Sequence, residues 1–404
     1  MNSMAKILCT VCGFELHSPQ ISFGRQPPSN RFMPDSESAT KLECHLLSLS
    51  TCTHCGTVQL FDRMPMESYR PRYDWLVYNE PERHLDDVAL HIASLPGISV
   101  SSRLMGITYK DQSTLTRMAN MGFTNTVCLQ DSDLESTVVP FGLETVQAIL
   151  SNPFNIAKLE ERYGKADVLV VRHITEHSLS SKELINSLSG LLAPGGYMLL
   201  ELPDSERVFN QNNYPFIWEE HISYFTEGSA RRLAQEVNSQ VLWLGRYSYP
   251  YEDSLNLVLN FPATDLKTKK NNLHDALPQP NMTEHFYNQF SAFREQWRIK
   301  LEGIISNGDR VAIFGAGHLA VKFINFFKLE DLITCVIDDH PKKLGMYMPG
   351  SGLPIISSGR LKGMGIRYCV STLSPESELK VRNKLANFFD SGGIFLPAFN
   401  TVSS

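Results

Sequence analysis

Histidine and glutamate side chains follow two apolar runs in the middle of the chain. After ADVLVV comes RHITEH (172–177), and after YMLLEL and a polar loop comes WEEHISYFT (218–226). Apolar runs of this length and branching are typical of buried strands. Strand ends face the ligand crevice in open α/β sheets. The pattern therefore predicts an active site that gathers His173, His177 and His221.

Four cysteines form two CxxCG motifs near the N-terminus, namely Cys9, Cys12, Cys52 and Cys55. Each motif can form a tight turn that directs two thiolates at one ion, and two such turns supply the tetrahedral four-sulfur shell that Zn²⁺ prefers. We predict a structural zinc site, because four sulfurs leave no open position for chemistry. A redox dithiol is the alternative, and His45 or His54 could replace one sulfur as a ligand.

A second candidate site lies near the C-terminus, where an apolar run is followed by GAGHLA (315–320). A strand, a glycine-rich turn and a helix in this order can cradle a phosphate. The next apolar run ends at Asp338, 21 residues after Gly317, close to the roughly 20 expected for a ribose-binding acid. With Gly315 and Lys343, these residues predict a nucleotide-binding site. The alternative is a nucleotide-shaped domain whose crevice is empty.

The order of apolar runs and turn residues divides the chain into three parts. Residues 1–65 carry the cysteine motifs, and residues 66–265 and 280–404 each alternate between strand-like and helix-like patterns. The stretch 262–280 is polar and ends in PQP, which indicates a linker. We therefore predict an α/β protein with an N-terminal zinc-binding module followed by two Rossmann-like domains.

Composition excludes several classes of protein. The 404 residues are 42% hydrophobic and 20% charged with a formal net charge of −6, which fits folded domains and supplies no basic surface for nucleic acid. No apolar run approaches the roughly 20 residues of a membrane span, and the N-terminus lacks the apolar core of a signal peptide. The cysteine usage fits a reducing compartment. We expect a cytoplasmic monomer or homodimer without nucleic-acid or membrane partners.

The motifs, in their order, resemble those of the zinc-containing sugar C-methyltransferases, which act on nucleotide-linked keto-deoxysugars. The likeness covers nearly the whole chain. It rests on the paired CxxCG motifs, PPSNRF, RHITEH, LLAPGG before a strand, EEHISYFT, FGAGHLAVKF, VIDDHPKKLG and MYMPGSGLPI. LLAPGG alone is typical of all class I methyltransferases. The cysteine motifs together with EEHISYF favour the sugar C-methyltransferases among them. The resemblance implies a class I methyltransferase domain in the middle of the chain and a nucleotide-linked sugar as the substrate.

The resemblance also implies a reaction at the carbon beside a sugar ketone. A base removes the α proton, the enolate is stabilised, and its carbon attacks the methyl group of S-adenosylmethionine. His221 is implied as the base, because a free imidazole pKa of about 6.5 suits proton transfer near neutrality. Glu220 would orient it, and His177 would contact the ketone or enolate oxygen. Tyr224 and Tyr78, the latter a loose match to a tyrosine of the family's cleft, complete the predicted catalytic set.

The S-adenosylmethionine site is expected at the first strand–loop–helix of the middle domain. The family's loop reads IGxNDGxL, and the corresponding segment here reads MGITYKDQSTL. Gly106 matches the first glycine of the family's loop, and Asp111 matches its aspartate. The position of the second glycine is occupied by Ser113 at best. Asp131, after the next strand, and His173 complete the predicted cofactor-binding set.

Two departures from the family leave other functions open. Trp218 stands where the family commonly has a tyrosine, and an indole donates only through its NH group. Loss of the second glycine affects the fit of the cofactor's methionine part against the backbone. The alternatives are a nucleotide-sugar-binding protein that has lost its cofactor, methyl transfer to oxygen or nitrogen of a related substrate, and oxidoreduction that uses the C-terminal loop.

Overall fold

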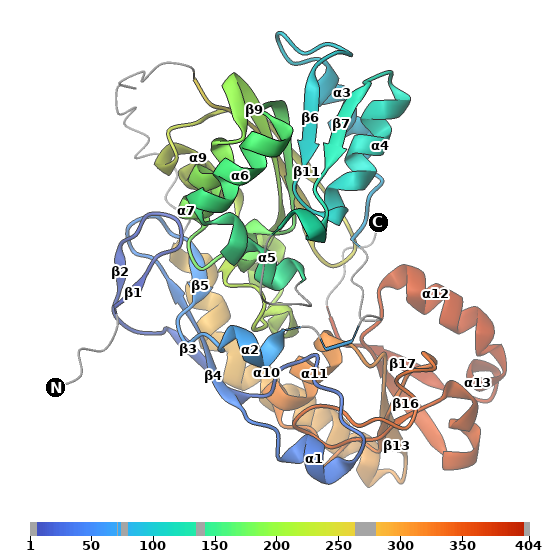
Figure 1. Ribbon diagram of the computed structural model, residues 1–404. Helices are drawn as coiled ribbons and strands as arrows, with labels where there is room; N and C mark the ends of the chain where they lie inside the picture. The colour runs from blue at the N-terminus through green and yellow to red at the C-terminus, as the bar shows by residue number, and fades with distance from the viewer. Residues whose placement is uncertain (1–5, 71, 74–79, 135–141, 263–279, 400–404) are drawn as a thin grey trace.

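The computed structural model describes residues 6–70, 72–73, 80–134, 142–262 and 280–399 (Figure 1). Tyr78 and most of the expected linker lie outside these residues. In Figure 1 the middle domain forms the upper body of the molecule, and the N-terminal strands and the C-terminal domain form the lower body.

The middle domain is built on a six-stranded sheet in the order β11-β12-β9-β8-β6-β7. Its strands are β6 (Arg103–Gly106), β7 (Asn125–Cys128), β8 (Ala166–Arg172), β9 (Leu192–Asp204), β11 (Gln240–Tyr247) and β12 (Asp253–Asn260). β6, β7, β8 and β9 pair in parallel, and β12 pairs antiparallel with both β9 and β11. The sheet is therefore mixed, with one strand running against the others.

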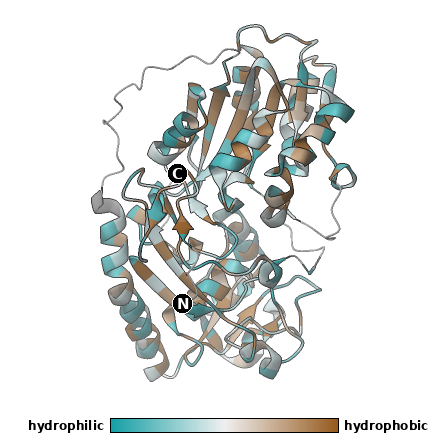
Figure 2. Ribbon diagram, turned by 60° about the vertical axis from the view of Figure 1, so that its left-hand side comes forward, coloured by the Kyte–Doolittle hydropathy of each residue, from teal (hydrophilic) through white to brown (hydrophobic). Residues whose placement is uncertain are grey.

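Helices cover both faces of this sheet, which explains why β8 is apolar along nearly its whole length. Val168 and Val170 pack on α3 and α4, whereas Leu169 and Val171 pack on the face covered by α5, α6, α7 and α9. The helices of this domain are α3 (Leu85–Ala93), α4 (Gln112–Asn120), α5 (Leu143–Leu150), α6 (Pro153–Tyr163), α7 (Ser181–Ser189), α8 (Glu206–Asn210) and α9 (Glu227–Glu236). Figure 2 shows the apolar strands between these helices. The alternation predicted from the sequence is confirmed here.

The N-terminal part contributes a two-stranded ribbon and three strands of a four-stranded sheet. Its elements are β1 (Ile7–Leu8), β2 (Glu15–Leu16), β3 (Ile21–Gln26), α1 (Ser36–Thr40), β4 (His45–Thr51), β5 (Val58–Leu60) and α2 (Met66–Tyr69). The fourth strand is β10 (Ser223–Tyr224), which comes from the middle domain and pairs antiparallel with β5. The N-terminal sheet is thus completed by the segment that carries His221.

The C-terminal domain is a parallel five-stranded sheet in the order β15-β14-β13-β16-β17. Its strands are β13 (Arg310–Phe314), β14 (Cys335–Ile337), β15 (Ile355–Ile356), β16 (Ile366–Ser371) and β17 (Ile394–Pro397). Its helices are α10 (Pro280–Ser306), α11 (His318–Phe327), α12 (Pro375–Lys384) and α13 (Ala386–Asp390). The strand order reverses between β13 and β16, the position at which doubly wound sheets bind ligands.

One apolar core runs from the N-terminal sheet into the C-terminal domain. Phe23 of β3 stacks on Phe326 of α11 with ring centroids 4.4 Å apart, and Phe290 of α10 packs edge-on against the same Phe23. A second core places the cysteine motifs beside the helices of the middle domain. Across the part of the chain that the structure describes, no helix has the length and apolar character to cross a membrane.

Candidate active site

The loop that carries His221 is fixed by backbone hydrogen bonds on both sides. The N–H of Ile222 donates to the carbonyl oxygen of Glu176 at 2.8 Å, and the N–H of Leu60 donates to the carbonyl oxygen of Ile222 at 2.9 Å. Glu176 lies in the short 3₁₀ helix η3 (Thr175–His177) that follows β8. The two sequence motifs that predicted an active site are therefore joined directly, and β5 holds them from the other side.

His177 and His221 lie next to each other in an edge-to-face arrangement, with ring centroids 4.9 Å apart. The Nδ1 atom of His177 lies 2.7 Å from the carbonyl oxygen of Glu220. Since a carbonyl only accepts, Nδ1 carries the proton and Nε2 holds the lone pair in the neutral ring. Glu176, His177 and His221 offer ligand atoms that all lie within 4.8 Å of one another.

The environment of His221 favours its neutral form. Burial lowers the pKa of His221 well below its usual value, and the nearby His177 and His318 rings act in the same direction. The imidazole is half-buried, and no hydrogen bond to its ring occurs in the described part of the chain. A neutral imidazole with an available lone pair can accept a proton from a substrate.

The two glutamates before His221 have different surroundings. Glu219 is fully buried and forms an ion pair with Lys322 of α11 at 2.7 Å, and it also accepts hydrogen bonds from the N–H and hydroxyl of Ser29. Glu220 is 1% exposed and accepts a hydrogen bond from the Asn30 side chain at 3.3 Å. The PPSNRF loop is therefore attached to both carboxylates.

Tyr224 braces the same loop from within. Its hydroxyl accepts a hydrogen bond from the N–H of Trp218 at 2.9 Å and donates to the carbonyl oxygen of Trp218 at 3.1 Å. Burial raises the pKa of Tyr224 well above its usual value. The Tyr224 hydroxyl thus uses both its donor and an acceptor position on the backbone of Trp218. This favours a positioning role over the catalytic role predicted from the sequence.

The expected cofactor loop is held in shape by Asp111. The carboxylate accepts hydrogen bonds from the N–H groups of Ile107, Thr108 and Arg172, at 2.7, 2.7 and 3.0 Å. Burial raises the pKa of Asp111 to about 7, against the opposing effect of these donors and of the Arg172 charge. A Cβ at Gly106 would lie 2.7 Å from the Cβ of Asp111. Gly106 is therefore required for this turn, and Asp111 shapes the loop through its backbone.

His173 belongs to a buried charge network that links the cofactor loop to the catalytic loop. Its Nε2 lies 3.1 Å from Glu201 and its Nδ1 lies 3.5 Å from Glu176. Burial opposes the charge, but these two carboxylates raise the pKa of His173 to about 10. Its φ of 53° is in the left-handed region, which non-glycine residues adopt uncommonly.

Sequence reasoning missed the other members of this network. His84, at the start of α3, contacts Glu201 at 2.9 Å, and Arg172 pairs with the second oxygen of the same carboxylate. Glu201 lies inside the apolar run of β9, and a carboxylate in a buried strand is the one signal that could have identified it. Asp131, predicted to bind the cofactor, is exposed in the turn after β7.

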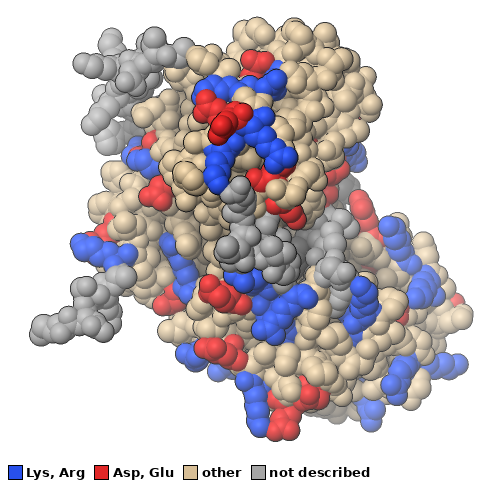
Figure 3. All heavy atoms as spheres, viewed as in Figure 1, with Lys and Arg blue, Asp and Glu red and all other residues tan. Residues whose placement is uncertain are grey.

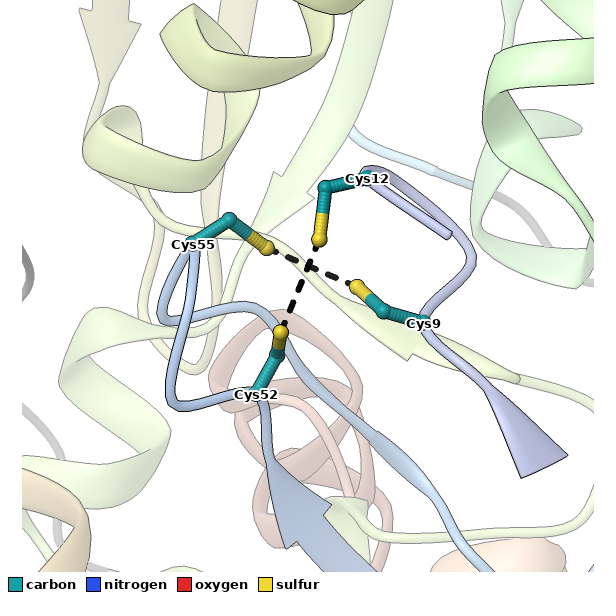
Figure 4. A group of neighbouring side chains, drawn as sticks. All are labelled: Cys9, Cys12, Cys52 and Cys55. Carbon is teal, nitrogen blue, oxygen red and sulfur yellow. Dashed lines mark hydrogen bonds between the residues drawn. The ribbon is translucent and has the colours of Figure 1, made fainter. Parts of the chain in front are cut away.

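The four cysteines of the CxxCG motifs lie together, with their sulfur atoms directed at a common centre (Figure 4). Cys9 and Cys55 are 3.4 Å apart, Cys12 and Cys52 are 3.6 Å apart, and none forms a disulfide. Ligands of a tetrahedral zinc ion with Zn–S bonds of about 2.3 Å would be about 3.8 Å apart. The thiols therefore suit such an ion. His45 and His54 lie elsewhere, the first against Ser68 and the second against Arg232.

The glycine-rich loop lies between β13 and α11, the element order expected of a phosphate loop, but the charged side chains next to it already form hydrogen bonds. Asp338 accepts a hydrogen bond from the N–H of Ala316, and Lys343 donates to both Asp338 and the carbonyl oxygen of Ala316. Gly315 has a φ of 101°, and a Cβ added to it would lie 2.9 Å from the hydroxyl of Thr372, the residue after β16. Gly317 is open, since no atom lies within 4 Å of an added Cβ.

The C-terminal domain reaches the catalytic loop through this glycine-rich loop. His318, the first residue of α11, stacks on Trp218 with ring centroids 4.1 Å apart, and Trp218 in turn lies 5.1 Å from His221. Burial lowers the pKa of His318 to about 4. The candidate nucleotide site and the candidate proton acceptor are thus neighbours.

Comparison with known proteins identifies the family. A family model described as a methyltransferase domain matches residues 2–243, and one described as a C-methyltransferase C-terminal domain matches residues 267–399. The chain belongs to the methyltransferase family. It is an S-adenosylmethionine-dependent methyltransferase.

Individual relatives are distant. The C-methyltransferase NovU of Streptomyces niveus is 21% identical over 411 residues, which cover 96% of this chain and 94% of that protein. An O-methyltransferase family protein from Burkholderia thailandensis is 13% identical, with a TM-score of 0.31 over 46% of this chain and 57% of that one. The N-methyltransferase NodS from Bradyrhizobium japonicum WM9 is 12% identical, with a TM-score of 0.27 over 45% of this methyltransferase and 96% of NodS.

The surface of this methyltransferase carries charges of both signs. On the face shown in Figure 3, Lys and Arg side chains are interspersed with Asp and Glu side chains. This mixture agrees with the small formal net charge of −6.

Proposed function

We propose that this methyltransferase transfers the methyl group of S-adenosylmethionine to a carbon beside the ketone of a nucleotide-linked keto-sugar. The observation that carries the proposal is the placement of His221. Its half-buried ring, without a hydrogen-bond partner in the described residues, lies beside His177 and next to the segment that follows β8. The match of the C-terminal third to the C-methyltransferase C-terminal domain supports carbon as the acceptor.

The proton chemistry is divided between two histidines. Neutral His221 accepts the α proton of the substrate. His177, whose ring lies beside His221, is the residue we propose to contact the ketone or enolate oxygen, and its Nδ1–H is donated to the carbonyl oxygen of Glu220. Methyl transfer to the deprotonated carbon requires the cofactor site and the site of His221 to meet at the end of β8.

The cofactor, when bound, supplies the methyl group that is transferred. The chain's contribution is the turn from Gly106 to Asp111, whose backbone is fixed by three N–H donors to one carboxylate. Arg172 donates its N–H to Asp111 of this turn and pairs with Glu201, which also contacts His173. His173 in turn lies 3.5 Å from Glu176 beside the catalytic loop. This arrangement supports cofactor binding although the loop lacks the second glycine of the family.

The role we propose for the four cysteines is a structural zinc site. Four free thiols with sulfur separations near those of a tetrahedral ion are the donor set that Zn²⁺ prefers. The site is attached to the catalytic loop, because Thr10, between Cys9 and Cys12, bonds to Ser223 at 2.8 Å between their hydroxyl oxygens. Metal binding there would fix β10 and hence the loop of His221.

For the nucleotide of the substrate, we propose the glycine-rich loop that contains Gly315 and Gly317. It adjoins the Trp218–His318 stack, which lies next to His221. Asp338 and Lys343 would shape this loop, because both bond to Ala316. A nucleotide bound at this loop would lie near the catalytic loop, because His318 stacks on Trp218.

Calorimetric titration with S-adenosylmethionine, followed by transfer assays on nucleotide-linked keto-sugars, tests this function. Wild-type protein should bind the cofactor and form a product with a new carbon-bound methyl group, identified by nuclear magnetic resonance. His221→Asn should retain cofactor binding and lose product formation. A product methylated on oxygen or nitrogen would contradict the proposal, and absence of cofactor binding by zinc-loaded protein would favour a non-catalytic nucleotide-sugar-binding protein.

A further inference from the structure

Glu176, His177 and His221 form a compact group of metal-ligating side chains that is separate from the four cysteines. One ligand atom from each residue lies within 4.8 Å of those of the other two. Two imidazoles and a carboxylate are a common protein ligand set for divalent transition metals, and three protein ligands leave positions open for water or substrate.

The carboxylate of Glu176 supplies a second, independent observation. The residue is 1% exposed, and its Oε2 atom has no hydrogen-bond partner within the described residues. Its other oxygen, Oε1, faces the His173 ring at 3.5 Å. Buried carboxylate oxygens are nearly always paired, so an oxygen left alone beside two imidazoles indicates a position for a cation.

The orientation of His177 fits the same interpretation. Metal-bound histidines usually donate their second ring N–H to a carboxylate or a backbone carbonyl, which fixes the tautomer and directs the lone pair at the ion. His177 donates Nδ1–H to the carbonyl oxygen of Glu220 at 2.7 Å. Its Nε2 is therefore the lone-pair nitrogen before any metal arrives.

The backbone keeps the three ligands in place. Ile222, adjacent to His221, donates its N–H to the carbonyl oxygen of Glu176 at 2.8 Å, and β5 holds Ile222 through Leu60 at 2.9 Å. The ligands thus come from two segments that are hydrogen-bonded to each other. A site of this kind needs only small side-chain movements to close around an ion, because its backbone is already ordered.

We propose that Glu176, His177 and His221 bind one divalent transition-metal ion such as Zn²⁺ or Co²⁺, and that this ion inhibits methyl transfer. The ion takes the His221 lone pair, which the substrate proton also needs. Metal binding and proton transfer to His221 therefore exclude each other. The inhibition rests on the proposed function, whereas the binding itself does not.

The binding experiment uses full-length protein with its cysteine site already loaded with zinc. Co²⁺ is titrated in by calorimetry, visible absorption reports nitrogen and oxygen ligation, and elemental analysis confirms that zinc remains. The expected result is one Co²⁺ per chain in addition to zinc. Glu176→Gln and His221→Gln should each weaken Co²⁺ binding at least about tenfold. Glu183→Gln, an exposed carboxylate on α7, should bind Co²⁺ as the wild type does.

Two results would overturn the site. One is the absence of a second metal equivalent in wild-type protein, and the other is equal Co²⁺ affinity in Glu176→Gln protein whose zinc content and thermal unfolding match those of the wild type. In transfer assays, Co²⁺ should reduce the rate until a chelator too weak to remove the cysteine-bound zinc restores it. An unchanged rate at saturating Co²⁺ would refute the inhibition. Binding is measured without substrate, so failure of the proposed reaction leaves the metal test intact.

Discussion

Glu219 and Lys322 form an ion pair of 2.7 Å in which both side chains are completely buried. Glu219 belongs to the catalytic loop, and Lys322 belongs to α11 of the C-terminal domain. Ser29 of the N-terminal part donates its backbone N–H to the same carboxylate. One buried charge pair therefore joins the three parts of the chain beside His221.

Removal of one partner should be costly, since it leaves the other charge buried and uncompensated. We expect Lys322→Met to lower the free energy of unfolding by about 3–5 kcal/mol, and the double variant Glu219→Gln/Lys322→Met to recover part of that loss. Urea unfolding followed by fluorescence measures both. Lys380→Met, an exposed lysine on α12, serves as the matched control. Equal stability of the single and double variants would argue against a coupled pair.

The same pair predicts a pH dependence of stability. Burial alone would raise the pKa of Glu219, but the Lys322 ammonium and the Ser29 N–H hold it below its usual value. A carboxyl whose folded pKa is depressed stabilises the fold above its unfolded pKa, about 4.3. That stabilisation is lost as pH falls through the depressed value. The stability advantage of the wild type over the double variant should therefore shrink below about pH 4, in urea melts at matched ionic strength.

The cofactor loop provides a steric prediction. An added methyl group at Gly106 would meet the Cβ of Asp111 at 2.7 Å and Leu115 at 3.0 Å. Gly106→Ala should displace the turn, lower the free energy of unfolding by about 1–3 kcal/mol as overpacking does, and weaken S-adenosylmethionine binding. Calorimetry measures the loss. Gly303→Ala, where no atom lies within 4 Å of the new methyl group, should bind the cofactor normally.

Local sequence signals were sufficient for the α/β class of the fold and for part of the site. The CxxCG spacing brings Cys9 and Cys12 together within one turn, and the repeat of the motif predicts their partners. The apolar run of β8, with polar residues at its end, placed His173 and His177 at the edge of the sheet. Such signals work because they depend on neighbours in the sequence.

The remaining features depend on residues far apart in the chain. No spacing rule relates Glu219 to Lys322, or His84 to Glu201, since the pairs form only when separate elements pack. Tyr224 illustrates the same limit, because the sequence shows a phenol near His221 but not the hydrogen bonds of its hydroxyl to Trp218. The sequence could predict that this side chain lies near the active site, but it could not predict its hydrogen-bond partners.

The cysteine site should control the order of the catalytic loop. Cys52→Ser removes one ligand of the proposed zinc ion and should release zinc, which would loosen the hydrogen bond between the hydroxyls of Thr10 and Ser223. We expect faster amide hydrogen exchange at β10 and a lower rate of methyl transfer. Cys44→Ser, outside the cluster, should change neither exchange nor zinc content. Retention of zinc and of protected β10 amides in Cys52→Ser would disprove this coupling.

Tyr224→Phe separates a positioning role from a catalytic one. The substitution removes two hydrogen bonds to the Trp218 backbone, each worth about 1 kcal/mol. If the phenol only braces the loop, kcat should fall by about tenfold or less, while the cofactor Kd and the pH dependence of kcat/KM stay as in the wild type. A general acid would behave differently, because its removal typically costs about 10²–10⁴-fold and abolishes one limb of the pH profile. Steady-state kinetics across pH therefore decides between the two, and the buried, doubly bonded hydroxyl favours the smaller effect.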